Sequence, residues 1–243
     1  MLKTVVIIPS RLHAERLPNK PLAEINGLPM IVHVMERAKE SNVGDVIVAT
    51  PDNEILKVVK ENNGNAFLTN NEHKTGSDRI FEVFKSEYKN VANIIINLQG
   101  DMPNIKPESI TKLNEFMQGE NCDIGTLASE IKNQEELNDT NVVKVAVEKE
   151  LDENNFLEAK DFFRKNKILK DKKVYHHVGC YAFTNQSLSK YVDLPRSKKE
   201  IERNLEQMRA LENKMSIKVG LCKSLPLGVD TVEDLEKIKK EMK

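Results

Sequence analysis

Short apolar runs alternate with segments of helical periodicity along the first hundred residues. The apolar runs are predicted to form buried strands, at residues 4–9, 45–50, 66–68 and 94–98. The segments between them repeat apolar side chains every three or four positions and are predicted to form helices, at residues 29–42, at 53–63 and after Ser77, which is placed to cap the third. Strands separated by helices of this length predict β-α-β crossovers and an α/β fold with a mainly parallel sheet.

The second half of the chain has a less regular pattern. Three strands are expected, at residues 142–147, 174–183 and 217–221, and two helices, at residues 200–213 and 231–242. Residues 148–173 are dense in charge, with a lysine-rich run at 165–173, and are interpreted as an excursion from the main sheet, either a lobe or a dimer arm. An exposed polar loop is the alternative. No interdomain linker or repeat interrupts residues 1–243, so a single domain is expected.

Cations follow the first predicted strand closely. Arg11, Arg16 and Lys20 lie in the loop after residues 4–9, at the carboxyl end of the strand, where open α/β sheets bind ligands. Guanidinium and ammonium groups neutralise phosphate oxygens, so this loop predicts a polyphosphate site. The alternative is a basic surface loop that solvates the end of the strand.

Two carboxylates are candidates for a metal site. Asp101 follows the strand at 94–98 and the small Gly100, and Asp230 lies directly before the last predicted helix. Two carboxylates that converge on a phosphate site suit Mg²⁺, which takes few protein oxygens together with water and phosphate oxygens. The alternatives are a turn residue for Asp101 and a helix cap for Asp230, worth about 1 kcal/mol without any metal.

Composition excludes several other classes. The net charge is −1, with 37 basic and 38 acidic residues, so any anion site must be local. The three cysteines are scattered, which fits a reducing cytoplasm, and neither a membrane span nor a signal peptide is evident, so a cytoplasmic protein is expected. The chain has no dinucleotide-binding, P-loop, nucleophile-elbow or zincin motif. His176 and His177 should point to opposite sides of their strand, with one of them at a site.

Several short motifs together resemble one family. They are Ile8-Pro-Ser-Arg11, Arg16-Leu-Pro-Asn-Lys-Pro-Leu22, Thr75-Gly-Ser-Asp-Arg79, Gln99-Gly-Asp101, His177-Val-Gly179, Leu205-Glu-Gln207 and Gly228-Val-Asp-Thr231. In this order they resemble the 3-deoxy-manno-octulosonate (Kdo) cytidylyltransferases. The first motifs are shared by many sugar nucleotidyltransferases, whereas the last three indicate the Kdo family. The resemblance implies a Rossmann-like three-layer α/β/α fold of the nucleotide-diphospho-sugar transferase type.

The resemblance also implies an activity, which is the transfer of CMP from CTP to Kdo, with release of pyrophosphate, for lipopolysaccharide biosynthesis. Arg11 and Lys20 would hold the triphosphate, with Arg16 nearby, and Asp101 and Asp230 would hold Mg²⁺; these four, without Arg16, form the expected catalytic set. The expected nucleotide-binding residues are Pro9, Ser10, Arg11, Lys20, Thr75, Gly76, Ser77 and Gln99. The expected sugar-binding residues are Gln99, Arg164, His177, Glu206 and Gln207. Arg79 is expected to brace its loop.

The chain departs from the family pattern at three places. Asn19 stands where the family usually has glycine, and Met102 where it has glutamate. The family's aromatic-Ser-Arg segment, followed by Ile-Pro, is replaced by Phe162-Phe-Arg-Lys165. Arg164 is the candidate to clamp the Kdo carboxylate, since arginine binds carboxylates in a bidentate manner.

Two other functions are compatible with the sequence. One is CMP transfer to a related acidic sugar, such as 8-amino-Kdo or sialic acid. The other is a non-catalytic nucleotide-binding regulatory protein, because a fold does not fix a function. The family resemblance also implies a homodimer, for which residues 148–173 are a candidate contact, and neither a nucleic acid nor a membrane is an expected partner.

Overall fold

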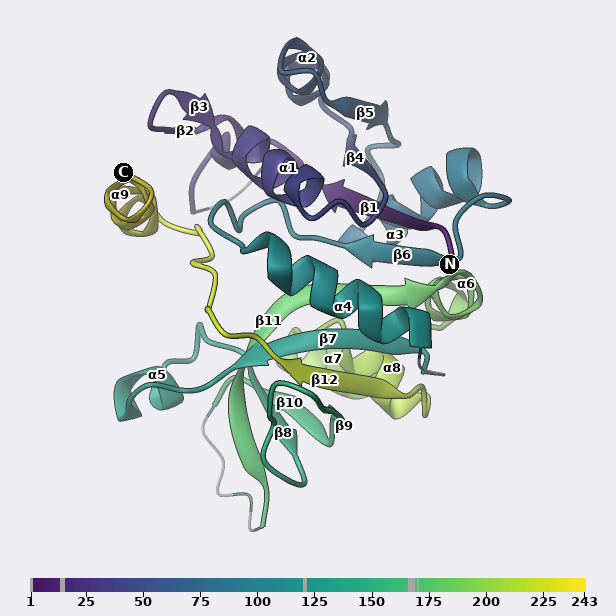
Figure 1. Cartoon of the computed structure of the whole chain (residues 1–243), viewed down its shortest axis with the longest axis vertical. Coiled ribbons are helices and arrows are strands. Elements are labelled where there is room, and N and C mark those ends of the chain that lie inside the picture. Colours follow the sequence, from purple (N-terminus) through teal and green to yellow (C-terminus); the bar gives the residue numbers. More distant parts are fainter. Residues whose placement is uncertain (1, 14–15, 120–121, 166–168, 170) are drawn as a thin grey trace.

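A ten-stranded sheet forms the centre of the molecule in the computed structural model, which describes residues 2–13, 16–119, 122–165, 169 and 171–243 (Figure 1). The main path of the sheet runs in the order β5-β4-β1-β6-β11-β7-β12-β9, and β8 joins β11 and β10. The strands are β1 (Thr4–Pro9), β4 (Asp45–Thr50), β5 (Asn65–Leu68), β6 (Ile94–Asn97), β7 (Ile124–Ser129), β8 (Lys144–Val147), β9 (Phe156–Glu158), β10 (Asp161–Phe163), β11 (Lys173–Thr184) and β12 (Ile217–Leu221).

Most of the central strands run in one direction. Strands β4 and β6 are parallel to β1, β5 is parallel to β4, and β12 is parallel to β7. The long strand β11 lies antiparallel between β6 and β7, and therefore preserves the common direction on its two sides. The expected α/β fold with a mainly parallel central sheet is confirmed.

Helices cover both faces of this sheet. Figure 1 shows α1 and α4 on the near face and α3, α7 and α8 behind it. The helices are α1 (Met30–Glu40), α2 (Asn53–Glu61), α3 (Gly76–Val83), α4 (Pro107–Gly119), α5 (Gln134–Asn138), α6 (Asn185–Asp193), α7 (Lys198–Arg203), α8 (Met208–Glu212) and α9 (Val232–Glu241), with a π-helical turn at Phe84–Tyr88 after α3. Among the residues that the structure describes, no helix is long and apolar enough to cross a membrane.

Strand β1 is buried on both faces. Val5 and Ile7 belong to the core on the α3 side, while Val6 and Ile8 pack into the core that α1 and α4 cover. Because successive side chains of a strand point to opposite faces, a strand between two helical layers needs a continuous apolar run. This is why the first strand could be recognised in the sequence without alternation.

The structure corrects two sequence predictions and adds elements that were not expected. Thr75, and not Ser77, caps α3, because its hydroxyl accepts from Asp78 N while the Asp78 carboxylate accepts from Thr75 N. The helix expected over residues 200–213 is divided into α7 and α8 by Asn204, which adopts a left-handed conformation (φ 51°). Helix α4 and strand β7 were not predicted.

The segment at residues 148–173 contributes two strands to the sheet. Strand β9 pairs with β12, and β10 pairs with β8, so both lie within the ten-stranded sheet. Residues 166–168 and 170 of the lysine-rich run lie outside the described residues. The dimer-arm interpretation of this segment stays a prediction.

A small third core joins the amino-terminal loop to the carboxyl-terminal helix. Leu17 and Ile25 pack with Val229, Leu235 and Ile238. The hairpin β2 (Glu24–Ile25) and β3 (Leu28–Pro29) lies beside α9, far from it in the sequence (Figure 1). This packing brings the loop with Lys20 beside the segment with Asp230.

Candidate active site

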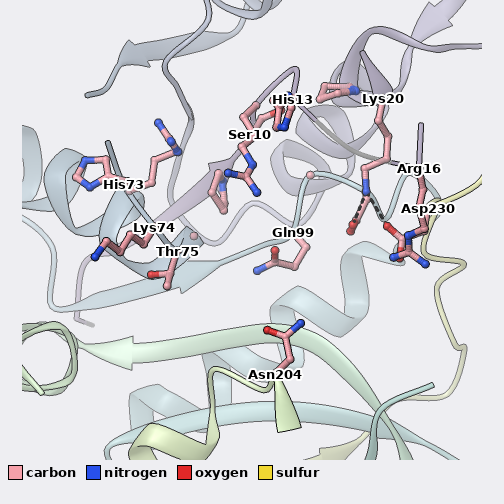
Figure 2. Close-up of a pocket in the computed structure, with 17 residues that line it drawn as sticks. Ser10, His13, Arg16, Lys20, His73, Lys74, Thr75, Gln99, Asn204 and Asp230 are labelled. Carbon is pink, nitrogen blue, oxygen red and sulfur yellow. Dashed lines mark hydrogen bonds and ion pairs between the residues drawn. The ribbon is translucent and has the colours of Figure 1, made fainter. Parts of the chain in front are cut away.

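Two cavities meet at the carboxyl ends of β1 and β6. The first has a volume of about 560 Å³ and the second about 320 Å³. Gln99 and Asn204 line both of them, so the two cavities form one continuous site. In Figure 2, Gln99 lies between the His73–Thr75 loop and the Lys20 and Asp230 side chains, opposite Asn204.

The first cavity has a strongly cationic wall. Seven of the eight predicted nucleotide-binding residues line it, and Ser77 lies in the second cavity instead. The cationic side chains of the wall are Arg11, Arg16, Lys20, Lys74 and Arg79, against the carboxylates of Asp101 and Asp230. An excess of fixed positive charge in a cleft attracts polyanions, and a triphosphate is such a ligand.

Asp101 and Asp230 converge although 129 positions separate them in the sequence. The backbone N–H of Val229 donates to the carbonyl of Asp101 at 2.9 Å and joins the two loops. Lys20 Nζ lies between the carboxylates, 3.0 Å from Oδ2 of Asp101 and 3.0 Å from Oδ1 of Asp230. Arg16 binds the second carboxylate at 2.8 Å. Asp230 is not the cap of α9, since Thr231 and Asp234 form the capping box there.

Electrostatic attraction favours the charged forms of Lys20 and Asp230. Burial opposes the charge on Lys20, but the attraction of Asp101 and Asp230 outweighs burial and raises the pKa of the lysine. Burial likewise opposes the charge on Asp230, but Lys20 and Arg16 lower its pKa overall. The result is a compact set of charges at the end of the sheet.

The two carboxylates that contact Lys20 have the spacing and chemistry that fit Mg²⁺. Both carboxylates contact one nitrogen at 3.0 Å, so their nearest oxygens lie close enough to share a cation, and oxygen donors are the ones that Mg²⁺ takes. In the described part of the chain, no group of three or more His, Cys, Asp and Glu residues could hold a metal ion. Two carboxylates completed by phosphate oxygens and water therefore fit Mg²⁺, whereas a closed all-protein metal site is not found in that part.

Local backbone geometry explains one departure from the family pattern. Asn19 precedes Lys20 with φ 57°, a left-handed conformation that glycine adopts freely and asparagine tolerates. Asparagine at this position therefore preserves the turn that presents Lys20. A second departure, Met102, is buried within the core under α1 and α4.

Two polar residues of the first cavity differ in their hydrogen bonding. Arg79 donates to the carbonyl of Asn70 at 3.1 Å and to the hydroxyl of Thr69, in agreement with the expected bracing role. Burial and the nearby Arg11 lower the pKa of Arg79. Ser10 Oγ, in contrast, is buried without a hydrogen-bond partner, the one such side-chain atom among the described residues. A buried hydroxyl without a partner, in a residue that lines a cavity, indicates that a ligand supplies the partner.

All five residues predicted to bind the sugar line the second cavity, namely Gln99, Arg164, His177, Glu206 and Gln207. Both His176 and His177 line it, so the expectation that only one would reach a site is wrong. His176 Nδ1 contacts Glu136 Oε1 at 2.5 Å, while the ring of His177 contacts Thr126. Burial lowers the pKa of His177 to about 3, so its imidazole is neutral.

Glu206 contacts the hydroxyl of the buried Tyr191. Tyr191 donates its hydroxyl to the Glu206 carbonyl at 2.8 Å and contacts Oε1 at 3.3 Å. Burial raises the pKa of Glu206, and the Ser77 hydroxyl and Arg209 offset this only in part. The loop that carries Glu206 joins α7 to α8, and its neighbour Gln207 is buried.

Arg164 is held at the wall of the second cavity by backbone carbonyls. Its Nη1 donates to Asn141 O at 2.9 Å and to Thr140 O at 3.4 Å. Lys144, whose side chain is fully buried, donates to Arg164 O at 2.6 Å and to the Asp139 carbonyl, and burial lowers its pKa. A buried ammonium therefore fixes the two segments that carry Asn141 and Arg164.

Sequence reasoning missed several lining residues. The largest omission is Asn204, which borders both cavities from the left-handed turn between α7 and α8. An asparagine followed by a second apolar repeat is a helix-stop signal that could have located this turn. The other cavity residues not assigned in advance include His13, His73, Lys74, Asn97, Asn141 and Tyr181.

Comparisons with known proteins agree on one family. The cytidylyltransferase family model matches residues 5–217. The 3-deoxy-manno-octulosonate cytidylyltransferase of Bartonella tribocorum is 42% identical over 240 residues, covering 98% of this chain and 98% of the relative. The enzyme of the same name from Rhodopseudomonas palustris is 44% identical over 235 residues, covering 96% and 95%.

A solved structure gives the same answer. The structure of a CMP:2-keto-3-deoxy-manno-octonic acid synthetase complexed with CTP superposes with a TM-score of 0.87 at 35% identity, over 99% of this chain and 98% of that one. The agreement extends over nearly the whole length of each protein. The chain therefore belongs to the cytidylyltransferase family, in the group of the 3-deoxy-manno-octulosonate cytidylyltransferases.

Proposed function

We propose that the chain transfers CMP from CTP to Kdo, releasing pyrophosphate and forming CMP-Kdo. One observation carries the proposal: a cationic cavity that contains two converging carboxylates opens directly into a second cavity lined by hydrogen-bonding side chains. The first cavity suits a nucleoside triphosphate, and the second suits a polyhydroxylated acid. The family membership supports the same reaction class.

In such a reaction, most of the rate acceleration comes from positioning the substrates and neutralising the charge of the phosphates. The anomeric hydroxyl of the sugar attacks the α-phosphorus in line, and pyrophosphate leaves on the opposite side. Arg11 and Lys20 hold the triphosphate from the loop after β1, and Arg16 supports the charge cluster from one side. Thr75 and Gly76 at the start of α3, with Pro9 and Ser10, form the seat for the cytidine.

Mg²⁺ is the proposed cofactor, and Asp101 and Asp230 are the residues that would hold it. When bound, the ion neutralises charge on the phosphate oxygens and orients them. Lys20 contacts both carboxylates, so its ammonium is placed to move between them and the phosphates. The excess of cations around the cavity keeps the departing pyrophosphate stabilised.

The second cavity supplies contacts for the acidic sugar. Gln99 lies at its junction with the first cavity, where the sugar hydroxyl must meet the phosphorus. His177, Glu206 and Gln207 offer hydrogen bonds to hydroxyls, and Arg164 is the cation at the wall. We further propose that the enzyme acts as a cytoplasmic homodimer in lipopolysaccharide biosynthesis.

A pyrophosphate-release assay tests the proposal. CTP and Mg²⁺ are supplied with Kdo, with 8-amino-Kdo or with sialic acid, and Asp101→Asn is the control. Release with Kdo, lost in the control, supports the proposed reaction and the role of Asp101. Release only with another sugar would preserve the chemistry and replace the substrate, and CTP binding without release from any sugar would favour a regulatory protein.

A further inference from the structure

Thr126 is a fully buried polar residue in the middle of β7, beneath the second cavity. Its hydroxyl oxygen lies 3.0 Å from His177 Nε2, 2.8 Å from the carbonyl oxygen of Cys180 and 3.3 Å from that of Val178. A threonine hydroxyl has one proton to donate and can accept in addition. These three contacts therefore determine where the protons lie.

Carbonyl oxygens only accept, so the contact at 2.8 Å with Cys180 requires the proton of the Thr126 hydroxyl. If that proton pointed at His177 instead, two oxygens would face each other at 2.8 Å with no hydrogen between them. The hydroxyl oxygen must then accept from the imidazole. The proton of His177 consequently lies on Nε2.

The other ring nitrogen is left as an acceptor. The imidazole is neutral, because burial lowers the pKa of His177 to about 3, so Nδ1 carries no proton when Nε2 does. Within the described residues Nδ1 makes no hydrogen bond, and His177 as a whole keeps 7% of its surface exposed. His177 lines the second cavity, and Phe162 and Tyr181 hold its ring at centroid distances of 5.0 and 5.3 Å.

The carbonyls that orient Thr126 belong to an irregularity in β11. The pairing of β11 with β7 shifts register between Val178 and Tyr181, which is a β-bulge around Gly179. In a regular strand pair, these carbonyls would accept hydrogen bonds from backbone N–H groups of the neighbouring strand. The bulge turns the carbonyls of Val178 and Cys180 toward Thr126 and places Gly179 at the cavity wall.

We propose that Thr126 is a positioning residue that fixes His177 as the Nε2–H tautomer, so that Nδ1 accepts a hydrogen bond from a hydroxyl of the sugar in the second cavity. The identity of that ligand rests on the proposed function, whereas the tautomer rests on the hydrogen bonds alone. Thr126 itself is covered by the strand and touches no substrate.

Two variants of Thr126 separate the hydroxyl from the shape of the side chain. Thr126→Val keeps the volume and removes the hydroxyl, and Thr126→Ser keeps the hydroxyl. We expect Thr126→Val to raise the KM for Kdo about tenfold, with the KM for CTP unchanged, and Thr126→Ser to stay near the wild-type value. Equal KM values for Kdo in the wild-type and Thr126→Val enzymes would overturn the proposal.

Nitrogen-15 NMR of histidine-labelled protein gives a readout that does not depend on activity or on the folding of a variant. In the wild-type protein, we expect His177 to show a protonated Nε2 and an unprotonated Nδ1, and addition of Kdo to shift the Nδ1 resonance. A proton on Nδ1 would contradict the inference. If no sugar supports pyrophosphate release, the proposed function fails. If, in addition, His177 shows the Nε2–H tautomer but none of the tested sugars shifts its Nδ1 resonance, the ligand part of this inference is overturned as well.

Discussion

The side-chain nitrogen of Lys20 lies 3.0 Å from Oδ2 of Asp101. The same nitrogen lies 3.0 Å from Oδ1 of Asp230, so a single ammonium stands between the two carboxylates proposed to bind Mg²⁺. A cation that binds both carboxylates has to displace this ammonium. In the proposed mechanism, Lys20 would therefore couple metal binding to the arrival of the triphosphate, which offers the ammonium new partners.

Replacing Lys20 by methionine should strengthen metal binding in the absence of nucleotide. The two carboxylates then lose their internal counter-ion, and we expect the affinity for Mn²⁺, measured by electron paramagnetic resonance, to rise about tenfold. The affinity for CTP should fall in the same variant, because a phosphate-binding cation is lost.

Lys74→Met is the matched control for Lys20. Lys74 lines the same cavity, and within the described residues it contacts neither carboxylate. Its removal therefore changes the overall charge by the same amount but leaves the Lys20 ammonium in place. The Mn²⁺ affinity should change much less in this control. Equal effects of the two substitutions would refute the direct competition between Lys20 and the metal.

Ser10→Ala should have opposite effects on stability and on nucleotide binding. The hydroxyl of Ser10 is buried without a partner, so its removal should stabilise the free protein by about 1 kcal/mol. If CTP supplies the missing hydrogen bond, the CTP affinity should fall about fivefold. Urea unfolding and isothermal titration with CTP measure the two effects.

A hydroxyl that already has partners provides the comparison for Ser10. Ser187 is buried and donates to the carbonyls of Asp123 and Thr184, so Ser187→Ala should destabilise the protein without affecting CTP binding. Unchanged CTP affinity in Ser10→Ala would show that water, and not the nucleotide, satisfies the Ser10 hydroxyl.

The loop with Glu206 depends on a buried ion pair. Arg209 Nε and Nη2 donate to the two carboxylate oxygens of Glu200 at 2.9 and 2.7 Å, and the guanidinium lies 4.9 Å from the ring centre of Tyr191. Arg209→Met leaves a buried carboxylate whose remaining partners include Arg196 and the Ser197 N–H, and should lower the free energy of unfolding by about 3 kcal/mol. Because this pair connects α7 to α8, the KM for Kdo should rise as well.

Urea unfolding measures the stability part of this prediction, and steady-state kinetics measure the second part. Arg196→Met is the control, since Arg196 contacts the same carboxylate from a half-exposed position and should cost less than 1 kcal/mol. A similar loss in both variants would mean that the geometry of the buried pair is not what supports the loop.

The sequence pattern predicted strands correctly where the residues of the strand itself indicate that it is buried. Strands β1, β4 and β12 were predicted with their observed bounds, because each combines β-branched side chains with clear turn residues at its ends. The break at Asn204 was missed because the apolar repeat continues on both sides of it, and only the backbone conformation separates the two helices. Strand β7, although fully buried, includes Gly125, Thr126 and Ser129, which weaken its apolar signal.

The sequence showed which side chains to consider for the site, but not how they contact each other. The cations after β1 and the two carboxylates were recognised from their positions near strand ends and helix starts. Their contact through Lys20 depends on the hydrogen bond between Val229 and Asp101 and on the third core, which are long-range features. The proposed acceptor role of His177 was equally hidden, because it depends on a hydroxyl 51 positions away in β7.

The neutral state of His177 predicts how stability responds to acid. Its pKa is about 3 in the folded protein and 6.5 in the unfolded chain, so between these values the unfolded state binds more protons. The contribution of His177 to stability is therefore fully present above pH 6.5 and is lost progressively as the pH falls toward 3. From pH 7 to pH 4, this loss amounts to about 3 kcal/mol.

His177→Gln isolates this contribution, because glutamine does not titrate and can still donate to Thr126. The difference in the free energy of unfolding between the wild-type protein and the variant should become about 3 kcal/mol less favourable to the wild type when the pH falls from 7 to 4. Urea unfolding at both pH values measures this difference, in which the other titrating groups largely cancel. A difference that stays constant with pH would mean that His177 takes up a proton as readily in the folded protein as in the unfolded chain. Its Nδ1 would then carry a proton at pH 4 and could not accept one from a sugar hydroxyl at that pH.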